Sequence, residues 1–598
     1  VGVVSSQRTV QPERLRTRRN KTMAASNTIL DLDGVNPSIL LSTAVNPDGV
    51  RRILMDQQKG DLASLVAGRK MATVQDLEDD GDSESSSPRA ARQHGPPILP
   101  SSSTESDLPV GGRSDAKVPF SLSDPAFSHL PLKTDGAARA AADEAFPVNV
   151  ERTQTPLAKF KLDPCAYPPP PHKYGPVVLV SCYTDFSDLA HGPRGTEAAR
   201  AMRSYRLNIS DGTLTLLSLV GEKVMHNPAF TRRHPSLPIV YTCTESVKKE
   251  GQIISLKVEG STGALDEHCA RVGAGGTSTC YLTIHPKGRR MLLVNYWDST
   301  INTLELEADG TVGRVLASYD PKLGKPMKAS SDEHVNHSRN DDEAQAERQG
   351  DPHAHAVVLD PASGCIAYVP DLGMDVIRQL YFDEASGTLS PCGEVASGIK
   401  VKGSRRGLGP RYMQFHPSLN MAYVVNELSS EIAVFEFHPA FAANIAMCAT
   451  VADKQGTAPT DKQAVLARAA PTLSLAQSIS TLPEAYPREL NTCGRVTIHP
   501  TGDFVVTSNR GHDSVAVHRI HKDSTPPGLL TLAGIFHTRG ETPRHFQFDK
   551  TGQWLLVANQ DSNTVAVFGF NCSTGAVTYS GNTYPCQSPN FVCVWDGA

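Results

Sequence analysis

The pattern of hydrophobic and polar positions changes once along the chain, near residue 172. After that point short runs rich in β-branched residues recur, beginning with VVLVSCY at 177–183, and Gly, Pro, Asn and Asp separate them. Such runs between turn-forming residues are typical of β-strands in an all-β fold. The tetraproline at 168–171 is expected to be a stiff spacer before the first strand.

The strand runs repeat as a unit. An apolar run leads into a turn near Pro-x-Gly, a second run ends near Asn, and two further runs complete the unit. The turns are centred on Pro235, Pro286, Pro361, Pro417, Pro500 and Lys550. A period of roughly 50 residues, lengthened where polar insertions intervene, indicates a propeller or a solenoid.

A further unit is split between the two ends of the repeat region. The segment NFVCVW at 590–595 resembles a first strand with no second strand after it, and VVLVSCYTD resembles a second strand with no first strand before it. Pairing these two runs would remove the exposed sheet edges. We therefore predict an all-β, seven-bladed β-propeller over 173–598, closed by pairing of its N- and C-terminal strands.

The remaining segments differ in composition from the strand repeats. We expect surface insertions near 325–351 and 440–487, and the second of these has a helical tendency. Residues 1–172 are of low complexity, rich in Ser, Pro, Gly and Asp over 79–117, and are predicted to be largely disordered. The Arg-rich stretch at 8–21 leaves organelle targeting open, although we expect a cytoplasmic protein.

Composition excludes several classes of function. The formal net charge of −5 gives no support for a nucleic-acid partner. No run approaches the roughly 18 apolar residues of a membrane span, so we expect a soluble protein without a membrane partner. The 12 cysteines are scattered without metal-ligand spacing, which predicts reduced thiols and no zinc site. We expect a monomer that uses neither a cofactor nor a metal.

Two positions in each blade recur in place but differ in identity. Counted from the turn Pro or Lys550, positions −6 and +10 are expected to pair across the two innermost strands and to open at one mouth of the channel. The −6 positions are Ala229, Cys280, His355, Arg411, Gly494 and Arg544, with Asn590 in the split blade. The +10 positions are Glu245, Tyr296, Asp371, Glu427, Arg510 and Gln560, with Tyr183 in the split blade. Groups that vary on a repeated scaffold are where a ligand would be recognised.

The chemistry of this ring favours a small anion. Arginine side chains suit carboxylate or phosphate groups, and a histidine or carboxylate beside them could move a proton. His355 is expected opposite Asp371, and Arg411 opposite Glu427, although each pair could equally be structural. His353 and His355 share one strand face, but no third ligand has a spacing that supports a metal.

Other repeated positions are interpreted as scaffold. Asparagine recurs at position +9, where it is expected to serve turn chemistry, at Asn295, Asn426, Asn509 and Asn559. Histidine recurs just before the turn, at the opposite end of the hairpin, at His234, His285, His416 and His499. We predict a structural role for both sets.

Six phrases resemble, in order, the lactonase family of seven-bladed propellers: DPHAHAVVLDP, VPDLGMD, GPRYMQFHP, YVVNELSSEIAVF, SNRGHDSVAVH and TPRHFQFD. They cover most of 175–598, and the family includes bacterial-type 6-phosphogluconolactonase and the fungal carboxy-cis,cis-muconate lactonizing enzyme. The resemblance implies an active site without a metal. By motif, its catalytic residues would be His355, Arg411, Glu427 and Arg510.

The expected activity is hydrolysis of 6-phosphoglucono-1,5-lactone to 6-phosphogluconate, in the pentose phosphate pathway. This choice follows from how widespread that reaction is; muconate cyclisation and a non-catalytic binding platform remain alternatives. In hydrolysis, His355 or Glu427 would take a proton from water, Asp371 would orient His355, and the arginines would hold the phosphate or the oxyanion. The residues expected to bind the sugar-lactone substrate are Arg544, Asp371, Glu245, Gln560 and Tyr296.

Overall fold

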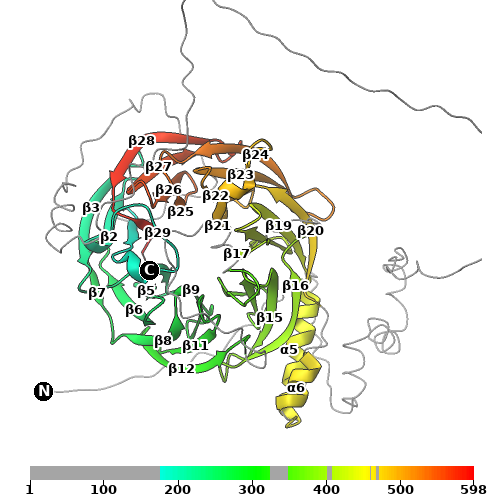
Figure 1. Cartoon of the computed structure of the whole chain (residues 1–598). Helices are drawn as coiled ribbons and strands as arrows, with labels where there is room; N and C mark the ends of the chain where they lie inside the picture. The colour runs from blue at the N-terminus through cyan, green and yellow to red at the C-terminus, as the bar shows by residue number, and fades with distance from the viewer. Residues whose placement is uncertain (1–174, 323–347, 401–406, 458, 467–470, 598) are drawn as a thin grey trace, which may run out of the picture.

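The computed structural model describes residues 175–322, 348–400, 407–457, 459–466 and 471–597. In this part of the chain 29 strands form seven sheets, and Figure 1 shows them arranged as blades around a central axis. The predicted seven-bladed propeller is therefore confirmed. The prediction of disorder for 1–172 lies outside the described residues.

Blades 1 to 3 follow one another along the chain. Blade 1 consists of β4 (Pro228–Arg233), β5 (Ile239–Thr244), β6 (Glu250–Val258), β7 (Leu265–Glu267) and β8 (Val272–Thr277). Blade 2 consists of β9 (Thr279–Ile284), β10 (Arg290–Asn295), β11 (Ile301–Leu306) and β12 (Val312–Tyr319). Blade 3 consists of β13 (Val358–Leu359), β14 (Ile366–Asp371), β15 (Val376–Phe382) and β16 (Leu389–Ala396).

Blades 4 to 6 repeat the same order of strands. Blade 4 consists of β17 (Pro410–Phe415), β18 (Met421–Asn426), β19 (Glu431–Phe437) and β20 (Leu473–Ser480). Blade 5 consists of β21 (Thr492–Ile498), β22 (Phe504–Arg510), β23 (Ser514–His521) and β24 (Leu529–His537). Blade 6 consists of β25 (Pro543–Phe548), β26 (Trp554–Asn559), β27 (Thr564–Phe570) and β28 (Val577–Pro585).

Blade 7 joins the two ends of the described chain. Its strands are β29 (Pro589–Trp595), β1 (Val177–Cys182), β2 (Arg200–Leu207) and β3 (Leu214–Gly221), in that order across the sheet. Strand β29 pairs antiparallel with β1, with Val594 opposite Val178. The predicted closure by N- and C-terminal strands is thus confirmed.

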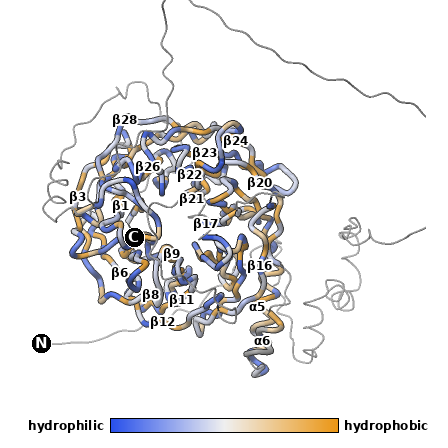
Figure 2. The backbone as a smooth tube through the Cα atoms, viewed as in Figure 1, coloured by the Kyte–Doolittle hydropathy of each residue, from blue (hydrophilic) through white to orange (hydrophobic). Residues whose placement is uncertain are grey.

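The hydrophobic core lies between the blades. The second strands of the blades, such as β18 and β26, are largely apolar and fully buried, because both faces of each sheet pack against a neighbouring blade. Figure 2 shows hydrophilic and hydrophobic positions mixed along the strands nearer the axis. Large aromatic side chains also bond across these interfaces. The Tyr423 hydroxyl donates to Gly528 O at 2.9 Å, and Trp554 Nε1 donates to Ile209 O at 2.9 Å.

Repeated polar residues hold adjacent blades together. His416 Nδ1 accepts from Leu419 N at 2.9 Å, so its Nε2 carries the proton and donates to Gly502 O of the next blade at 3.0 Å. The repeated asparagines act similarly: Asn426 Nδ2 donates at 3.0 Å to Ser397 O in the connection from the preceding blade. The predicted structural role of these residues is confirmed, and they link blades as well as turns.

Each innermost strand carries an irregularity at the position expected to face the channel. In blade 4, Pro410 pairs with Asn426 and Tyr412 with Val425, so that Arg411 is an extra, bulged residue. Corresponding register shifts occur in blades 1, 2, 5, 6 and 7. The predicted pairing of position −6 with +10 is therefore wrong. Position +10 pairs one residue earlier in blade 3, where Asp371 lies opposite Ala354, and two residues earlier in blade 5, where Arg510 lies opposite Thr492. A bulge inserts an unpaired residue into the strand and redirects its side chain.

The insertions lie outside the ring. The range expected near 440–487 contains α5 (Pro439–Lys454) and α6 (Pro459–Leu466), but it also includes β20, so the insertion ends earlier than expected. Both helices bury apolar side chains, such as Ile445 and Leu466, against blades 3 and 4. The insertion expected near 325–351 lies mostly outside the described residues. Short 3₁₀ turns form at Phe186–Asp188 and Arg488–Leu490.

Two further observations concern compartment and membrane. No helix in the described ranges is long and apolar enough to cross a bilayer. Ten cysteines of the described part are free thiols, as predicted for them.

A pair of glycine substitutions tests the packing between blades. Gly552 has φ +74°, and a Cβ there would lie 2.4 Å from His499 Nε2, whereas Gly456, at φ +62°, has open space. Gly456→Ala should cost about 1 kcal/mol from backbone strain, and Gly552→Ala about 2–4 kcal/mol because the clash adds to the strain. Denaturant unfolding of both variants measures the difference. Equal losses of stability would show that the His499 contact contributes nothing.

Candidate active site

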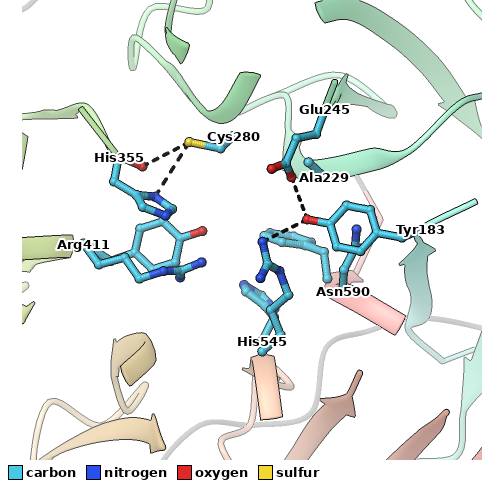
Figure 3. A pocket seen from close by; sticks show the side chains of 11 residues that line it. Tyr183, Ala229, Glu245, Cys280, His355, Arg411, His545 and Asn590 are labelled. Atoms are coloured by element: carbon cyan, nitrogen blue, oxygen red, sulfur yellow. Dashed lines mark hydrogen bonds between the residues drawn. The ribbon is translucent and has the colours of Figure 1, made fainter. Parts of the chain in front are cut away.

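A cavity lies at one end of the axial channel, where the bulged residues of several blades meet. Figure 3 shows the side chains around it. The cavity is lined by Tyr183, Ala229, Glu245, Cys280, His355, Arg411, Tyr412, Arg544, His545, Asn590 and Phe591. Eight of these are ring positions derived from the repeat, so the expectation that the ring gathers at one mouth agrees with this geometry.

Glu427 is the electrostatic centre of the site. Its carboxylate is buried and lies 2.8 Å from Arg411 Nε, 3.0 Å from Arg510 Nη2 and 2.6 Å from Arg348 Nη1. Although burial alone would raise the pKa of Glu427, the three guanidinium groups hold that pKa well below its usual range. Glu427 is therefore a fixed anion that positions cations, and it is a weak proton acceptor.

The arginines remain cationic and are only partly neutralised. Burial and the neighbouring guanidinium groups lower the pKa of Arg510 to about 10, which still leaves it protonated at pH 7. Arg411 Nη1 also donates to Gly494 O at 2.7 Å, and Arg510 Nη2 donates to Cys493 O at 2.7 Å. These backbone contacts hold both side chains across the mouth of blade 5.

His355 faces the same cavity from blade 3. Its ring meets the rings of Tyr296 and Tyr412 edge-on, with centroids 5.2 Å and 5.4 Å away, and its Nδ1 lies 3.7 Å from Cys280 Sγ. Burial and the Arg411 guanidinium hold the pKa of His355 well below its usual range. The imidazole is therefore neutral at pH 7.

The predicted contact between His355 and Asp371 is wrong. Asp371 is fully buried behind the site, where Arg378 Nε and Nη2 donate to Oδ2 at 2.9 Å and 2.7 Å, and His353 N donates to Oδ1 at 2.8 Å. Because both carboxylate oxygens are occupied, Asp371 neither orients His355 nor reaches the cavity. The one-residue bulge register explains the error, since Asp371 pairs with Ala354 instead.

The other residues expected to bind substrate divide into two groups. Glu245 lines the cavity and accepts from the Tyr183 hydroxyl at 2.6 Å, and that hydroxyl in turn accepts from Arg544 Nη2 at 2.9 Å. Tyr296 supports the His355 ring from behind. Gln560 is buried, donates to Asp561 Oδ1 at 3.2 Å, and is not among the residues that line the cavity.

Sequence reasoning missed the floor of the cavity. Tyr412, His545 and Phe591 occupy the position directly after the ring residue, which in a regular strand would point away from the channel. The bulge turns both residues inward. An aromatic or histidine recurs at this position in blades 1, 2, 4, 6 and 7, and that repetition was the available signal.

Two further residues come from connections that the repeat does not contain. Arg348, at the end of the expected insertion, reaches Glu427. His191, in the connection between β1 and β2, meets the Tyr183 ring edge-on with centroids 5.3 Å apart. Burial, with Arg544 and Arg510 nearby, holds the pKa of His191 well below its usual range. Nothing in the sequence distinguishes either residue from ordinary loop residues.

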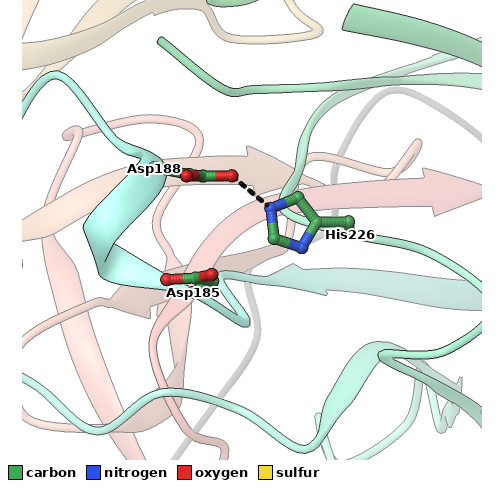
Figure 4. A group of neighbouring side chains, drawn as sticks. All are labelled: Asp185, Asp188 and His226. Carbon is green, nitrogen blue, oxygen red and sulfur yellow. Dashed lines mark hydrogen bonds and ion pairs between the residues drawn. The ribbon is translucent and has the colours of Figure 1, made fainter. Parts of the chain in front are cut away.

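One group of ligand-type side chains lies outside the cavity, formed by Asp185, Asp188 and His226 (Figure 4). Asp188 already lies 3.1 Å from His226 Nε2, 3.1 Å from Lys248 Nζ and 3.6 Å from Lys249 Nζ. Two lysines would compete with a cation for the same oxygens. The group is therefore explained as an ion-pair cluster.

Comparison with known proteins decides the family. A family model described as "Lactonase, 7-bladed beta-propeller" matches residues 177–594. The chain belongs to this lactonase family. The chain is also similar to proteins from Bacillus subtilis and Formosa agariphila, both named 6-phosphogluconolactonase and both 26% identical to it, over 371 and 377 residues. Each alignment covers 62% of this chain, with 86% of the Bacillus and 88% of the Formosa protein.

Solved structures support the fold of this lactonase domain. The structure of a periplasmic gluconolactonase from Pseudomonas aeruginosa matches with a TM-score of 0.52 at 20% identity, covering 70% of this chain and 99% of that one. At that identity the likeness shows the shared propeller alone.

Replacing Glu427 tests the electrostatic centre. Glu427→Gln should cost about 3–5 kcal/mol at pH 7, because it removes the anion from among buried guanidinium groups. The pKa of Glu427 is lowered in the folded state, so its contribution is present at neutral pH and is lost as the pH falls below about 4.3, the value in unfolded chains. Denaturant unfolding of wild type and variant between pH 7 and pH 3 checks this. The difference between their free energies of unfolding should become smaller only in acidic solution.

Glu431→Gln is the matched control, because Glu431, four residues after Glu427, is ion-paired at 2.6 Å with the half-exposed Arg488. It should cost less than about 1 kcal/mol. If the two glutamine variants lose equal stability, the buried ion pairs around Glu427 contribute no more to the free energy of unfolding than the Glu431–Arg488 pair does.

Proposed function

We propose that the cavity hydrolyses 6-phosphoglucono-1,5-lactone to 6-phosphogluconate. The observation that carries the proposal is that Arg411, Arg544 and the neutral imidazole of His355 line one cavity in a chain of the lactonase family. Two more guanidinium groups, those of Arg348 and Arg510, lie beside Arg411 on the Glu427 carboxylate. The relatives from Bacillus subtilis and Formosa agariphila bear the name of this activity.

The charge balance of the mouth supports a doubly charged substrate. Among the described residues of the site, Arg348, Arg411 and Arg510 pair with Glu427, and Arg544 is linked to Glu245 through the Tyr183 hydroxyl. These four cations and two carboxylates leave an excess of two positive charges. A phosphate monoester carries about −1.5 to −2 at pH 7 and would balance this excess. Planar guanidinium groups also match phosphate oxygens in geometry.

His355 is the better of the two candidate bases. Glu427 is held as an anion by three arginines, so its conjugate acid is too strong for efficient proton transfer from water. The pKa of His355 is also lowered, but it starts closer to neutrality, and an anionic substrate would offset the Arg411 field that lowers it. His355 would therefore become more basic once substrate is bound.

The reaction then proceeds by addition and ring opening. Water adds to the lactone carbonyl as His355 takes its proton, and the new oxyanion is stabilised by Arg411 and Arg510. The bond to the ring oxygen breaks, and His355 returns the proton to that oxygen as the sugar hydroxyl forms. The carboxylic acid product ionises, so each turnover releases one proton.

The proton release gives a direct assay. Purified protein should consume freshly made 6-phosphoglucono-1,5-lactone faster than buffer in a pH-stat, and Arg510→Ala should lower kcat/KM by about 10²–10³-fold. Lys287→Ala is the control, since Lys287 is exposed in the turn between β9 and β10, away from the cavity lining, and is paired with Glu384. It should leave the rate unchanged. Wild-type protein that does no better than buffer would refute this substrate.

The acid limb of the pH profile tests the base. His355 must be unprotonated to accept a proton. Its lowered pKa keeps the imidazole unprotonated even when the pH is somewhat below 6.5, about the usual pKa of histidine. Values of kcat/KM should therefore stay level down to about pH 6.5 and fall only in more acidic solution. His355→Gln should lower the rate and flatten this limb. An acid limb that survives the substitution would assign the base to another group.

A further inference from the structure

His545 presents a hydrogen-bond donor to the cavity floor. Its Nδ1 accepts from Val592 N at 3.1 Å, so the neutral ring must carry its proton on Nε2. Burial and the guanidinium groups of Arg495 and Arg411 hold the pKa of His545 well below its usual range, which keeps the ring neutral. The ring stacks on Phe591 with centroids 3.7 Å apart, and this contact fixes its plane.

Asn590 presents an acceptor to the same cavity. Its Nδ2 donates to Pro228 O at 2.7 Å, and only the nitrogen of an amide can make this bond. The orientation of the amide is therefore set, and Oδ1 is the atom left over. Figure 3 shows both Asn590 and His545 among the side chains around the cavity.

Neither of these two atoms has a hydrogen-bond partner in the part of the chain that the structure describes. His545 Nε2 and Asn590 Oδ1 are buried without a hydrogen bond among the described residues, in side chains only 2% exposed. Leaving such groups unsatisfied costs about 1–3 kcal/mol each. Asn302 Oδ1 is also unpartnered, but Asn302 lies on β11 and does not line the cavity. The pair on the floor is distinguished by the space beside it.

We propose that His545 and Asn590 form a hydroxyl-recognition pair that makes this site specific for polyhydroxylated anions. One hydroxyl group of the ligand accepts from His545 Nε2 and donates to Asn590 Oδ1. This inference rests on the proposed function and adds to it the residues that recognise a hydroxyl group of the sugar. A ligand that carries only carboxylates satisfies His545 but leaves Asn590 Oδ1 without a donor.

Recognition of this kind acts mainly by rejection. A site built to bond a hydroxyl discriminates strongly against an analogue that lacks it, because its buried polar groups then stay unpaired. The arginines at the mouth attract any small anion, so charge alone does not select the ligand. The Asn590 acceptor supplies the missing selection, since no carboxylate is a hydrogen-bond donor at pH 7.

The test compares two kinds of anion by isothermal titration calorimetry. The hydroxylated ligands are 6-phosphogluconate and gluconate, and the hydroxyl-free ligand is propane-1,2,3-tricarboxylate. Asn590→Leu should weaken binding of both hydroxylated ligands by about tenfold or more, the value of one hydrogen bond, and leave the tricarboxylate within about threefold. His545→Phe, which keeps the stacking on Phe591, should weaken binding of all three.

Asn302→Leu is the control, because it removes a buried amide with an unpartnered oxygen outside the cavity. It should change no affinity. Equal effects of Asn590→Leu on the hydroxylated and hydroxyl-free ligands would overturn the proposal, as would no effect on either. Protein that binds gluconate through Asn590 but does not open the lactone would refute the proposed function and leave the recognition pair standing.

A measurement on wild-type protein covers the case in which the variants do not fold. Nitrogen-15 NMR of histidine-labelled protein should show His545 protonated at Nε2 and bare at Nδ1 through neutral pH. Addition of gluconate should shift the Nε2 signal of His545 and leave the His518 signal in place, since His518 lies in blade 5 and does not line the cavity. A proton found on Nδ1 of His545 would overturn the proposal.

Discussion

A single buried carboxylate, Glu427, determines how the other charges of the site are arranged. Three guanidinium groups converge on it, and without an anion at this point they would repel one another in a space with little water. Glu427 neutralises only part of their charge, so the rest of the field acts on what lies nearby. Burial, together with that residual field, keeps the pKa of His355 low and its ring neutral, and the same field attracts an anionic ligand.

The two ends of each inner hairpin have different structural roles. At the turn end, residues such as His416 and Gly502 bond from blade to blade, and their identities recur because every interface has the same shape. At the far end the strand bulges, the ladder is interrupted, and a side chain is released towards the channel. A residue there contributes little to blade stacking, so blades can differ at this point without loss of the ring.

Much of the architecture could be predicted from the sequence, because the period of the turns and the split unit depend only on local pattern. The ring residues could be found in the same way, and Arg411 with Glu427 shows the contact expected. The contacts of His355 could not be predicted in this way, because a one-residue bulge does not change the hydrophobic pattern of the sequence. Arg348 and His191 depend on contacts between distant segments, and composition does not encode those.

The split blade affects how the molecule is made. Strand β1 is synthesised before the strands of the other six blades, yet its inner neighbour β29 is synthesised after all of them, so β1 must stay unpaired on that side until then. The cavity shares this delay, because Tyr183 follows β1 and Asn590 belongs to β29. Premature termination within the last blade would therefore release an open ring with a bare sheet edge and an incomplete cavity. Quality control in the cell would meet such a chain as an aggregation hazard.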